Sequence, residues 1–240
     1  MSTKLSVNIN KIALIRNSRG QNQPTLTKVA QDCERFGAQG ITVHPRPDQR
    51  HVRFDDIAPL MSVNTTEFNI EGYPTPDFME LVLQNRPKQA TLVPDPPGAL
   101  TSSEGWDTIK HAVFLKETIA ELKSKNIRVS LFVDPVERMV EGAAKVGADR
   151  IEFYTGQYAH DFFDDKNKAI APHVAAAKIA RDCHLGINAG HDLSLDNLRF
   201  YKNNIEGLLE VSIGHAIVCD ALYFGLQNTI QMYLNQLREN

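Results

Sequence analysis

The chain has few cysteines, and they do not form a disulfide or metal framework. The 240 residues include three, Cys33, Cys183 and Cys219, without a Cys-x-x-Cys pair or a Cys/His cluster of zinc-site spacing. An odd number of widely spaced cysteines, each in a segment that we predict to be helical, is typical of reduced, buried thiols in a cytosolic protein. We therefore expect no zinc site and a cytoplasmic location.

Long apolar runs and an excess of charge of one sign are missing as well. No apolar stretch approaches the roughly 20 residues that span a bilayer, and the opening MSTKLSVNIN lacks the apolar core of a signal peptide. The formal net charge of −3 gives no electrostatic reason to expect nucleic acid or an anionic membrane as a partner. The nucleotide-binding patterns GxxxxGK[ST] and GxGxxG do not occur.

The chain has instead a regular alternation of short β-branched runs and helix-like segments. We predict strands at 5–9, 41–44, 67–71, 91–93, 128–133, 150–154, 186–189 and 208–213. We predict helices at about 25–36, 54–62, 76–85, 107–125, 136–146, 167–183, 194–203 and 216–237. Several strand runs look apolar on both faces, as in parallel strands covered by helices. Strict alternation indicates an α/β protein, a single (β/α)8 TIM barrel over residues 1–240.

Two connections are long for such a barrel, at residues 94–106 after the fourth predicted strand and at 156–165 after the sixth. Both would lie at the carboxyl ends of the strands. Each is a candidate active-site lid, with a decorated surface loop as the alternative.

Polar residues stand where the predicted strands end. They are Asn8, Asn10, His44, Arg46, Glu71, Glu152, His191, Gly214 and His215. In TIM-barrel enzymes the catalytic side chains come from the carboxyl ends of several strands. The pattern therefore indicates both the active-site face and the candidate residues.

The segment HPRPDQRH places His44, Arg46 and His51 at the start of the loop after the second predicted strand. An imidazole exchanges protons near neutral pH, and a guanidinium grips phosphate or carboxylate with its planar fork. A lone strand-end histidine is more often structural than catalytic. The crowding of basic and imidazole side chains here favours a catalytic role for His44.

Two glutamates lie on predicted strands. Glu71 follows a buried run, and because desolvation raises the pKa of a carboxyl group, it is a candidate general base. An ion pair with a neighbouring arginine is the alternative. Glu152 lies inside its strand, where an unpaired charge is costly, so it is either paired or functional.

Gly-His turns end the last two predicted strands, with His191 after the seventh and Gly214-His215 after the eighth. In TIM barrels the loops after these strands often bind phosphate through backbone N–H groups and a helix N-terminus. The alternative is a pair of left-handed turns beside structural histidines. Arg19, which precedes Gly20 in the loop after the first strand, is another anion candidate or part of a solvated basic loop.

Together these residues predict a barrel enzyme that acts on small phosphorylated, carbonyl-bearing molecules by His/Glu proton transfer. One alternative is a sugar-phosphate epimerase or isomerase, which would use some of the same proton carriers and need no amine. Another is a non-catalytic barrel that binds a phosphorylated metabolite.

Seven segments occur in a fixed order across nearly the whole chain: VNINKIALIRNSRG, GITVHPRPDQRH, FNIEG, LVP, IEFYTG, NAGH and SIGHAI. Together they resemble the pyridoxine 5′-phosphate synthase family of vitamin B6 biosynthesis. The resemblance implies a TIM barrel with extra helices, a homo-octamer built from dimers, and no metal or organic cofactor. It implies a transferase that condenses 1-deoxy-D-xylulose 5-phosphate with 3-amino-2-oxopropyl phosphate through an imine, giving pyridoxine 5′-phosphate, phosphate and water.

The same resemblance implies roles for individual residues. His44 and Glu71 would be general bases, His191 a general acid, and Glu152 would stabilise a charged transition state. Residues implied to bind the aminoketone phosphate are Asn8, Arg19, Gly214 and His215. Those implied to bind the deoxyxylulose phosphate are Arg46, His51 and Thr101.

The chain departs from the family pattern at three positions. The family often has Asn-x-Asp-His where this chain reads NINK at residues 8–11, and Gly-His-Gly where it reads GHD at 190–192. We expect Lys11 to grip a phosphate or hydroxyl in place of the imidazole, and we keep Asn10 and Asp192 among the substrate-binding residues. Asp192 would leave its backbone N–H available but add a negative charge; it could instead cap the next helix.

Overall fold

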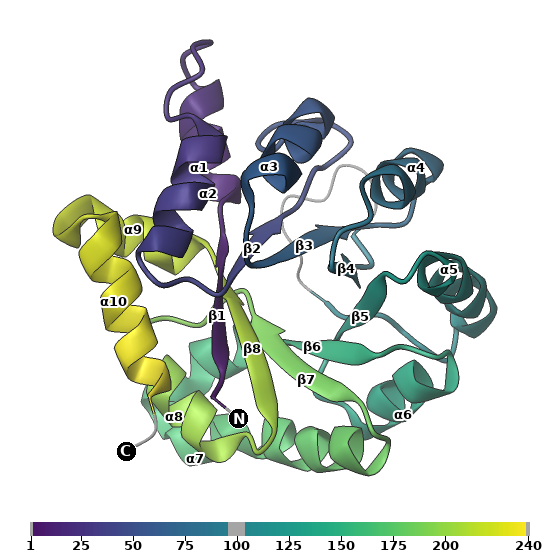
Figure 1. Cartoon of the computed structure of the whole chain (residues 1–240). Helices are drawn as coiled ribbons and strands as arrows, with labels where there is room; N and C mark the ends of the chain where they lie inside the picture. The colour runs from purple at the N-terminus through teal and green to yellow at the C-terminus, as the bar shows by residue number, and fades with distance from the viewer. Residues whose placement is uncertain (1, 96–103, 239–240) are drawn as a thin grey trace.

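The computed structural model describes residues 2–95 and 104–238 of the chain. Parallel strands close into a barrel in the order β1 to β8, and β8 pairs with β1 (Figure 1). The strands are β1 Lys4–Asn8, β2 Gly40–Val43, β3 Glu67–Gly72, β4 Gln89–Leu92, β5 Arg128–Val133, β6 Arg150–Tyr154, β7 Gly186–Gly190 and β8 Leu208–Ile213. The predicted TIM barrel is confirmed, and each predicted strand end lies within two residues of the observed one.

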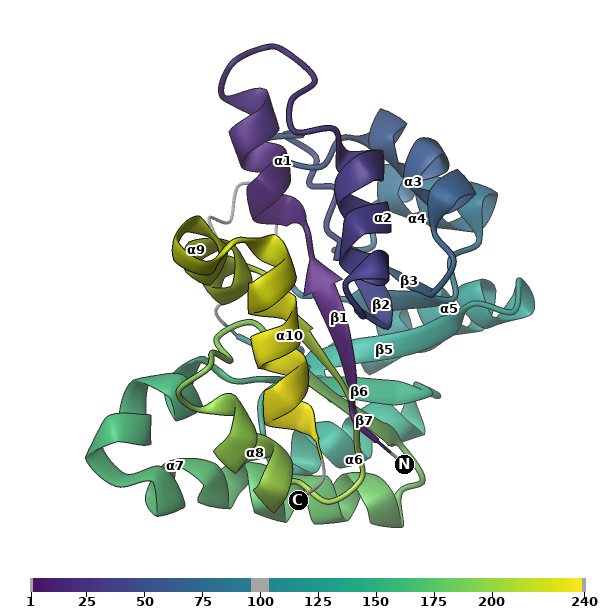
Figure 2. The same cartoon turned by 60° about the vertical axis from the view of Figure 1, so that its left-hand side comes forward.

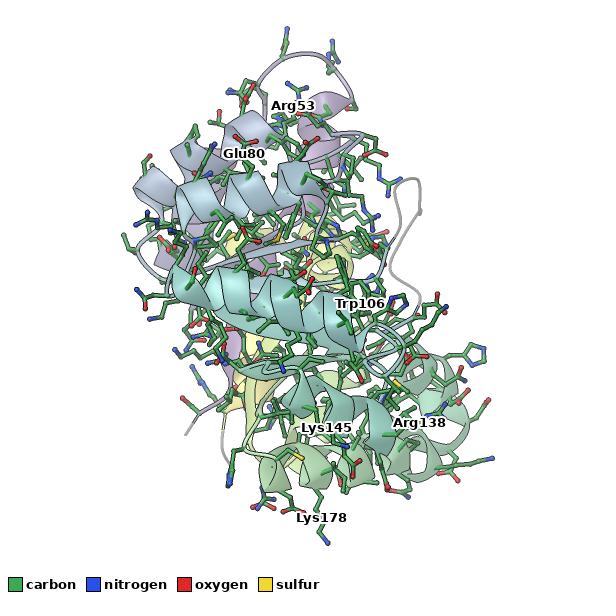
Figure 3. All side chains as sticks on the ribbon, turned by 90° about the vertical axis from the view of Figure 1, so that its right-hand side faces the viewer. Arg53, Glu80, Trp106, Arg138, Lys145 and Lys178 are labelled. Carbon is green, nitrogen blue, oxygen red and sulfur yellow. The ribbon has the colours of Figure 1, made fainter. Side chains whose placement is uncertain are left out.

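Helices surround the barrel (Figure 1). They are α1 Asn10–Asn17, α2 Leu26–Arg35, α3 Ile57–Val63, α4 Pro76–Asn85, α5 Ala112–Ser124, α6 Glu137–Lys145, α7 Gly156–Asp182, α8 Leu198–Asn204, α9 His215–Phe224 and α10 Leu226–Leu237. A short 3-10 helix, Phe54–Asp56, precedes α3. Two helices follow β1 (α1 and α2), and two follow β8 (α9 and α10), which accounts for the expected extra helices. Charged side chains such as Lys178 extend outward from this layer (Figure 3). In the described ranges, no helix combines the length and apolarity needed to cross a membrane.

Strand residues alternate between two environments. The parallel register places Thr42 beside Asn69 and Thr91 beside Ser130, all polar and facing the barrel interior. The apolar residues between them, such as Val7, are fully buried against the helices outside. The expectation that several strands are apolar on both faces is therefore wrong. The hydrophobic core forms a ring between sheet and helices, and the barrel centre is polar.

The segment between β1 and Arg19, for which no helix was predicted, is helix α1, and Arg19 lies in the turn that follows it. Its side chains Ile12, Ala13 and Arg16 are buried on one face. Arg16 forms an ion pair with Asp56, its Nη2 lying 2.9 Å from Oδ2. This tertiary contact fixes a helix that the short sequence pattern did not reveal.

The predicted loop at 156–165 is the first part of helix α7, so this prediction is wrong. The helix is interrupted at Asp165, whose backbone is extended. The carboxylate of Asp165 accepts hydrogen bonds from the N–H groups of Asn167 and Lys168 at 3.0 and 3.1 Å, and so caps the predicted second part. The first part is held by aromatic packing, with the Tyr158 and Tyr201 rings 5.0 Å apart.

The predicted helix at 216–237 is divided into α9 and α10. Gly225 separates them with a φ of +74°, a conformation that a glycine adopts without steric cost.

The cysteines correct one expectation. Cys33 is buried in α2, and burial raises the pKa of its thiol to about 12. Cys183 is half-buried and Cys219, on α9, is exposed. The prediction of buried thiols therefore holds for Cys33 alone.

Candidate active site

The carboxyl ends of β1, β2 and β3 bring three predicted residues together. Asn8 ends β1, His44 follows β2, and Glu71 lies near the end of β3. The Nδ1 atom of His44 lies 3.9 Å from Oε2 of Glu71, and the Asn8 amide donates to the same oxygen at 3.4 Å. His44 and Glu71 are both buried. The cluster therefore lies at the barrel mouth but away from bulk solvent.

Asn10, the first residue of α1, supports this cluster through the backbone. Its side-chain oxygen accepts a hydrogen bond from the N–H of His44 at 2.9 Å, and its own N–H donates to the Asn8 side chain at 3.0 Å. Asn10 thus ties the ends of β1 and β2 together. The neighbouring Lys11 is exposed on the first turn of the helix.

Burial shifts the proton affinities of His44 and Glu71 in opposite directions. Burial raises the pKa of the Glu71 carboxyl to about 7; the His191 charge opposes this rise and the Asp95 charge adds to it. Burial also lowers the pKa of His44 well below its usual range, and the positive charge of Arg46 lowers it further. At neutral pH His44 is therefore an uncharged proton acceptor, while Glu71 is poised to exchange its proton.

Glu152 points into the barrel from β6 and is only 4% exposed. Burial raises the pKa of its carboxyl well above the usual range, and the charges of Glu71 and Glu210 raise it further. Across the described ranges, no hydrogen bond or ion pair joins Glu152 to another residue. A Cβ atom on Gly190 would lie 2.7 Å from Oε1 of Glu152, so any larger residue at position 190 would clash with this carboxyl group.

His191 follows β7 with a left-handed φ of +75°. Its Nδ1 lies 2.9 Å from Oδ2 of Asp192. Burial by itself would lower the pKa of His191, but the hydrogen bond and charge of Asp192, with the charge of Glu71, raise it overall. His191 therefore retains its proton more readily than an ordinary histidine.

The expectations for Asp192 need correction. Its backbone N–H is not available, because it donates to Thr155 Oγ1 and to the Gly190 carbonyl, both at 3.2 Å. Its carboxylate does not cap the next helix, because it contacts His191. Asn197 is the residue that precedes α8.

Of the three residues predicted to bind the deoxyxylulose phosphate, the structure describes two. Arg46 is buried and forms an ion pair with Asp95, with 2.7 Å between Nη2 and Oδ2. His51 accepts a hydrogen bond from the next backbone N–H at 3.0 Å, and burial lowers its pKa to about 4, with Arg46 contributing. Thr101 lies outside the described residues.

The predicted aminoketone-phosphate residues divide into two groups. Gly214 and His215 form the start of α9, where backbone N–H groups and the helix dipole favour an anion. A Cβ on Gly214 would lie 3.0 Å from the Asn8 carbonyl oxygen, so close packing explains this glycine; its φ of −125° is not left-handed. Arg19 lies exposed in the turn after α1, the helix that extends beyond the β1 arrowhead (Figure 2).

Some residues of the site escaped the sequence argument. Asp95 was missed because only the fold shows that it pairs with Arg46. Thr155 was missed although it follows β6 as His44 follows β2, a signal that could have been used. The Tyr154 ring lies 5.9 Å from the His191 ring, centroid to centroid. Within 2–95 and 104–238, no group of three or more His, Cys, Asp and Glu side chains is arranged to hold a metal ion.

The closed barrel and the acid–base side chains at its carboxyl end define the class of TIM-barrel enzymes. Solved structures share the fold. Phosphoribosyl anthranilate isomerase from Thermotoga maritima is similar with a TM-score of 0.61, 12% identity and 98% of each chain covered. Tryptophan synthase from Mycobacterium tuberculosis is similar with a TM-score of 0.67, 12% identity, and 100% of this chain and 94% of that chain covered.

Comparison with proteins of similar sequence identifies the family. The profile of the family described as "Pyridoxal phosphate biosynthesis protein PdxJ" matches residues 5–239. The protein is 60% identical over 237 residues to pyridoxine 5′-phosphate synthase of Cytophaga hutchinsonii, covering 99% of this chain and 100% of the relative. It is 59% identical over 236 residues to the synthase of Flavobacterium johnsoniae, with 98% and 100% covered. The chain belongs to the PdxJ family of pyridoxal phosphate biosynthesis proteins.

Proposed function

We propose that this protein is a pyridoxine 5′-phosphate synthase. It would condense 1-deoxy-D-xylulose 5-phosphate with 3-amino-2-oxopropyl phosphate and release phosphate and water. The observation that carries the proposal is the buried pair of His44 and Glu71, 3.9 Å apart, with a carboxyl pKa of about 7 beside a neutral imidazole. Membership of the family and the names of the relatives support the same activity.

The first chemical step is attack of the substrate amine on the ketone of the deoxyxylulose phosphate. The amine loses a proton as the C–N bond forms, and the neutral His44 is suited to accept it. Loss of water then gives an imine, and the departing hydroxyl needs a proton. His191, whose pKa is raised by Asp192 despite its partial burial, is the donor that we assign.

The later steps are enolisation, loss of phosphate and ring closure by an aldol-type reaction. Each moves a proton to or from carbon or oxygen, and a carboxyl group with a pKa of about 7 can serve in either direction. We assign Glu71 to these transfers. Binding both substrates in one mouth also removes the entropic barrier to their encounter.

Glu152 would stabilise positive charge on the imine. An isolated buried carboxyl group is protonated at neutral pH, but a cation formed beside it favours the ionised form. The absence of a cationic partner in the described ranges fits this role better than a structural ion pair.

The two phosphates would occupy two anion sites. The start of α9, with Gly214 and His215, would hold the aminoketone phosphate together with Asn8 and Arg19. Arg46 and His51 would hold the other phosphate with Thr101, and Arg46 would then exchange its contact with Asp95 for the phosphate. Asn10 and Lys11 stay in the predicted binding set. The proposed reaction changes no redox state, and we propose no cofactor.

We further propose a cytoplasmic homo-oligomer built from dimers, an octamer when complete. Three consecutive apolar side chains at the end of α9, Leu222, Tyr223 and Phe224, are exposed in the single chain, with Tyr223 exposed by 85%. A patch of this kind is typical of a surface that contacts another protein. Light scattering after size-exclusion chromatography measures the assembly directly.

The decisive test is synthesis from purified components. Pyridoxine 5′-phosphate, followed by its fluorescence, should appear only when both phosphorylated substrates are present, with and without a chelator. The variant His44→Asn should still bind both substrates while its kcat falls by about 10²- to 10⁴-fold. Isomerisation of one sugar phosphate without the amine would replace our proposal by an epimerase or isomerase. Binding without any chemistry would indicate a metabolite-binding barrel.

A further inference from the structure

The turn after β7 holds His191 in a backbone conformation that a histidine rarely adopts. Its φ of +75° lies in the left-handed region, where the Cβ atom of a non-glycine residue is crowded. Such a conformation persists only where neighbouring groups determine it. The contacts around the turn therefore identify what fixes the imidazole.

Two buried side chains hold the backbone of the turn at both sides of Asp192. Thr155, fully buried at the end of β6, donates its hydroxyl to the Gly190 carbonyl and accepts the Asp192 N–H at 3.2 Å. Asn197, 3% exposed, donates its amide to the Asp192 carbonyl at 3.2 Å. Its own carbonyl accepts the hydroxyl of the buried Tyr158 at 2.8 Å. Asp192 is thus fixed through both of its backbone polar groups.

The carboxylate of this fixed residue meets the imidazole, with 2.9 Å between Asp192 Oδ2 and His191 Nδ1. We infer that Asp192 is a positioning residue, whose carboxylate holds His191 by Nδ1 and keeps it protonated, so that Nε2 presents the proton to the substrate. The inference rests on the general-acid role proposed for His191. It replaces the substrate-binding role that the sequence suggested for Asp192.

The charges around His191 come from several elements. Asp192, Glu71 on β3 and Asp95 after β4 favour the protonated imidazole, whereas a charged His44 after β2 would oppose it. The neighbouring rings of Phe132 on β5 and Tyr154 on β6 lie 6.5 and 5.9 Å away, centroid to centroid. Asp192 acts on the ring through both its charge and a hydrogen bond. Its removal should therefore lower the pKa of His191 even though Glu71 and Asp95 remain.

The engaged groups of Asp192 argue against direct contact with a phosphate. Its N–H is taken by Thr155 and Gly190, and its carboxylate would repel an anion. The same carboxylate strengthens a proton donor at the neighbouring position. A negative charge beside His191 is therefore explained by acid catalysis better than by substrate binding.

The direct test is an NMR titration of the isotope-labelled histidine rings in the full-length protein. The variant His191→Asn identifies the His191 signal. In Asp192→Asn this signal should titrate at lower pH than in the unchanged protein. The variant Asp196→Asn, which removes an equal charge from the same exposed loop, should leave the titration as it was. An unchanged His191 titration in Asp192→Asn overturns the inference.

Kinetics give the second readout. A general acid must be protonated, so kcat falls as the pH rises through its pKa, and in Asp192→Asn this fall should begin at lower pH. Since a general acid contributes about 10²- to 10⁴-fold, we expect roughly a tenfold lower kcat at alkaline pH, with KM little changed. Asp192→Glu should recover part of the loss. A raised KM with unchanged kcat would return Asp192 to substrate binding and overturn the inference.

The two measurements separate this inference from the proposed function. The NMR titration needs no turnover, so it decides the role of Asp192 toward His191 even if no pyridoxine 5′-phosphate is formed. Synthesis of product by the unchanged protein, together with an unaffected His191 titration in Asp192→Asn, would reject the inference and keep the proposed function.

Discussion

Buried carboxyl groups at the two ends of the barrel interior have different partners. At the amino end, Glu67 on β3 forms an ion pair with Arg128 on β5, and Arg150 on β6 lies 3.9 Å from the same carboxylate. At the carboxyl end, Glu71 and Glu152 stand on the same two strands, β3 and β6, without an arginine in contact among the described residues. On β3, four residues therefore separate a carboxylate paired with an arginine, Glu67, from one whose contacts are the Asn8 amide and the neutral His44, Glu71.

The difference shows in the proton affinities. At the amino end burial raises the pKa of Glu210, but Arg150 and Arg128 oppose the rise. At the carboxyl end burial raises the pKa of Glu152, and the charge of Glu71 raises it further. The carboxylate in contact with arginines stabilises the barrel, whereas the carboxyl groups without an arginine in contact, Glu71 and Glu152, are available for proton transfer. The contrast matches the division of TIM barrels into a stability face and a catalytic face.

The largest expected effect is at the catalytic face. His44→Asn should lower kcat by about 10²- to 10⁴-fold, because the neutral imidazole beside Glu71 is removed. Stability measured by thermal unfolding should change little. The matched control is His184→Asn, which replaces an exposed histidine before β7 and should leave kcat unchanged. Equal kcat in both variants would contradict the assignment of the base.

At the opposite end, Glu67→Ala should destabilise the protein by about 3 kcal/mol, because it leaves Arg128 and Arg150 near each other without this carboxylate. Urea denaturation measures the change. The control Glu206→Ala removes an exposed partner of Arg181 and should cost less than about 1 kcal/mol. If both variants lose the same stability, the amino-end pair is not structural.

Glu71→Gln should have the reverse effect on stability. The folded-state pKa of about 7 lies above the ordinary 4.5. Below about pH 4.5 the carboxyl is protonated in both the folded and the unfolded state, so the pKa shift costs no stability. Between about pH 4.5 and 7 it is ionised mainly in the unfolded state, so the free energy of unfolding falls as the pH rises. The variant should therefore gain on the order of 2 kcal/mol over the unchanged protein at pH 8 and nothing at pH 4. Denaturation curves at both pH values give the difference. A constant difference would show that Glu71 has an ordinary pKa.

The smallest effects belong to the uncharged layer between the two ends. The Ser130 hydroxyl is buried and has no hydrogen-bond partner within the described part of the chain. Ser130→Ala should therefore change stability by less than about 0.5 kcal/mol. Thr91 donates to the Asn69 side chain at 3.0 Å, so Thr91→Val should cost about 1 to 2 kcal/mol. A larger loss for Ser130→Ala would indicate an unrecognised partner.

Much of the fold could be predicted because strands and helices alternate with clear turn signals. The helix predicted at 76–85 is α4 with the same bounds, and the Thr75 hydroxyl that precedes it accepts a hydrogen bond from the Phe78 N–H. Helix α1 and the first part of α7 could not be predicted. Their stability comes from distant partners, Asp56 for Arg16 and Tyr201 for Tyr158. Local propensity does not contain such contacts.

The candidate site shows the same limit. Strand ends located His44 and Glu71 correctly at one barrel mouth, because parallel strands end together. The pairing of Asp95 with Arg46 could not be predicted, since contacts between loops depend on the closed barrel. Thr155 could have been found by its place after β6, but its contacts with the turn after β7 could not. The sequence also suggested a free N–H for Asp192, which the folded turn uses internally.

The alternation along the strands has a consequence for how such a protein changes over generations. Outward residues such as Val7 and Leu131 pack in the hydrophobic core with the helices, whereas the side chain of an inward residue such as Thr42 forms hydrogen bonds with other residues of the lining. Selection can thus exchange the lining of the barrel, and with it the chemistry at the mouth, while the helix contacts stay as they are. One scaffold can carry several activities because the residues that assemble it and the residues that react are different sets.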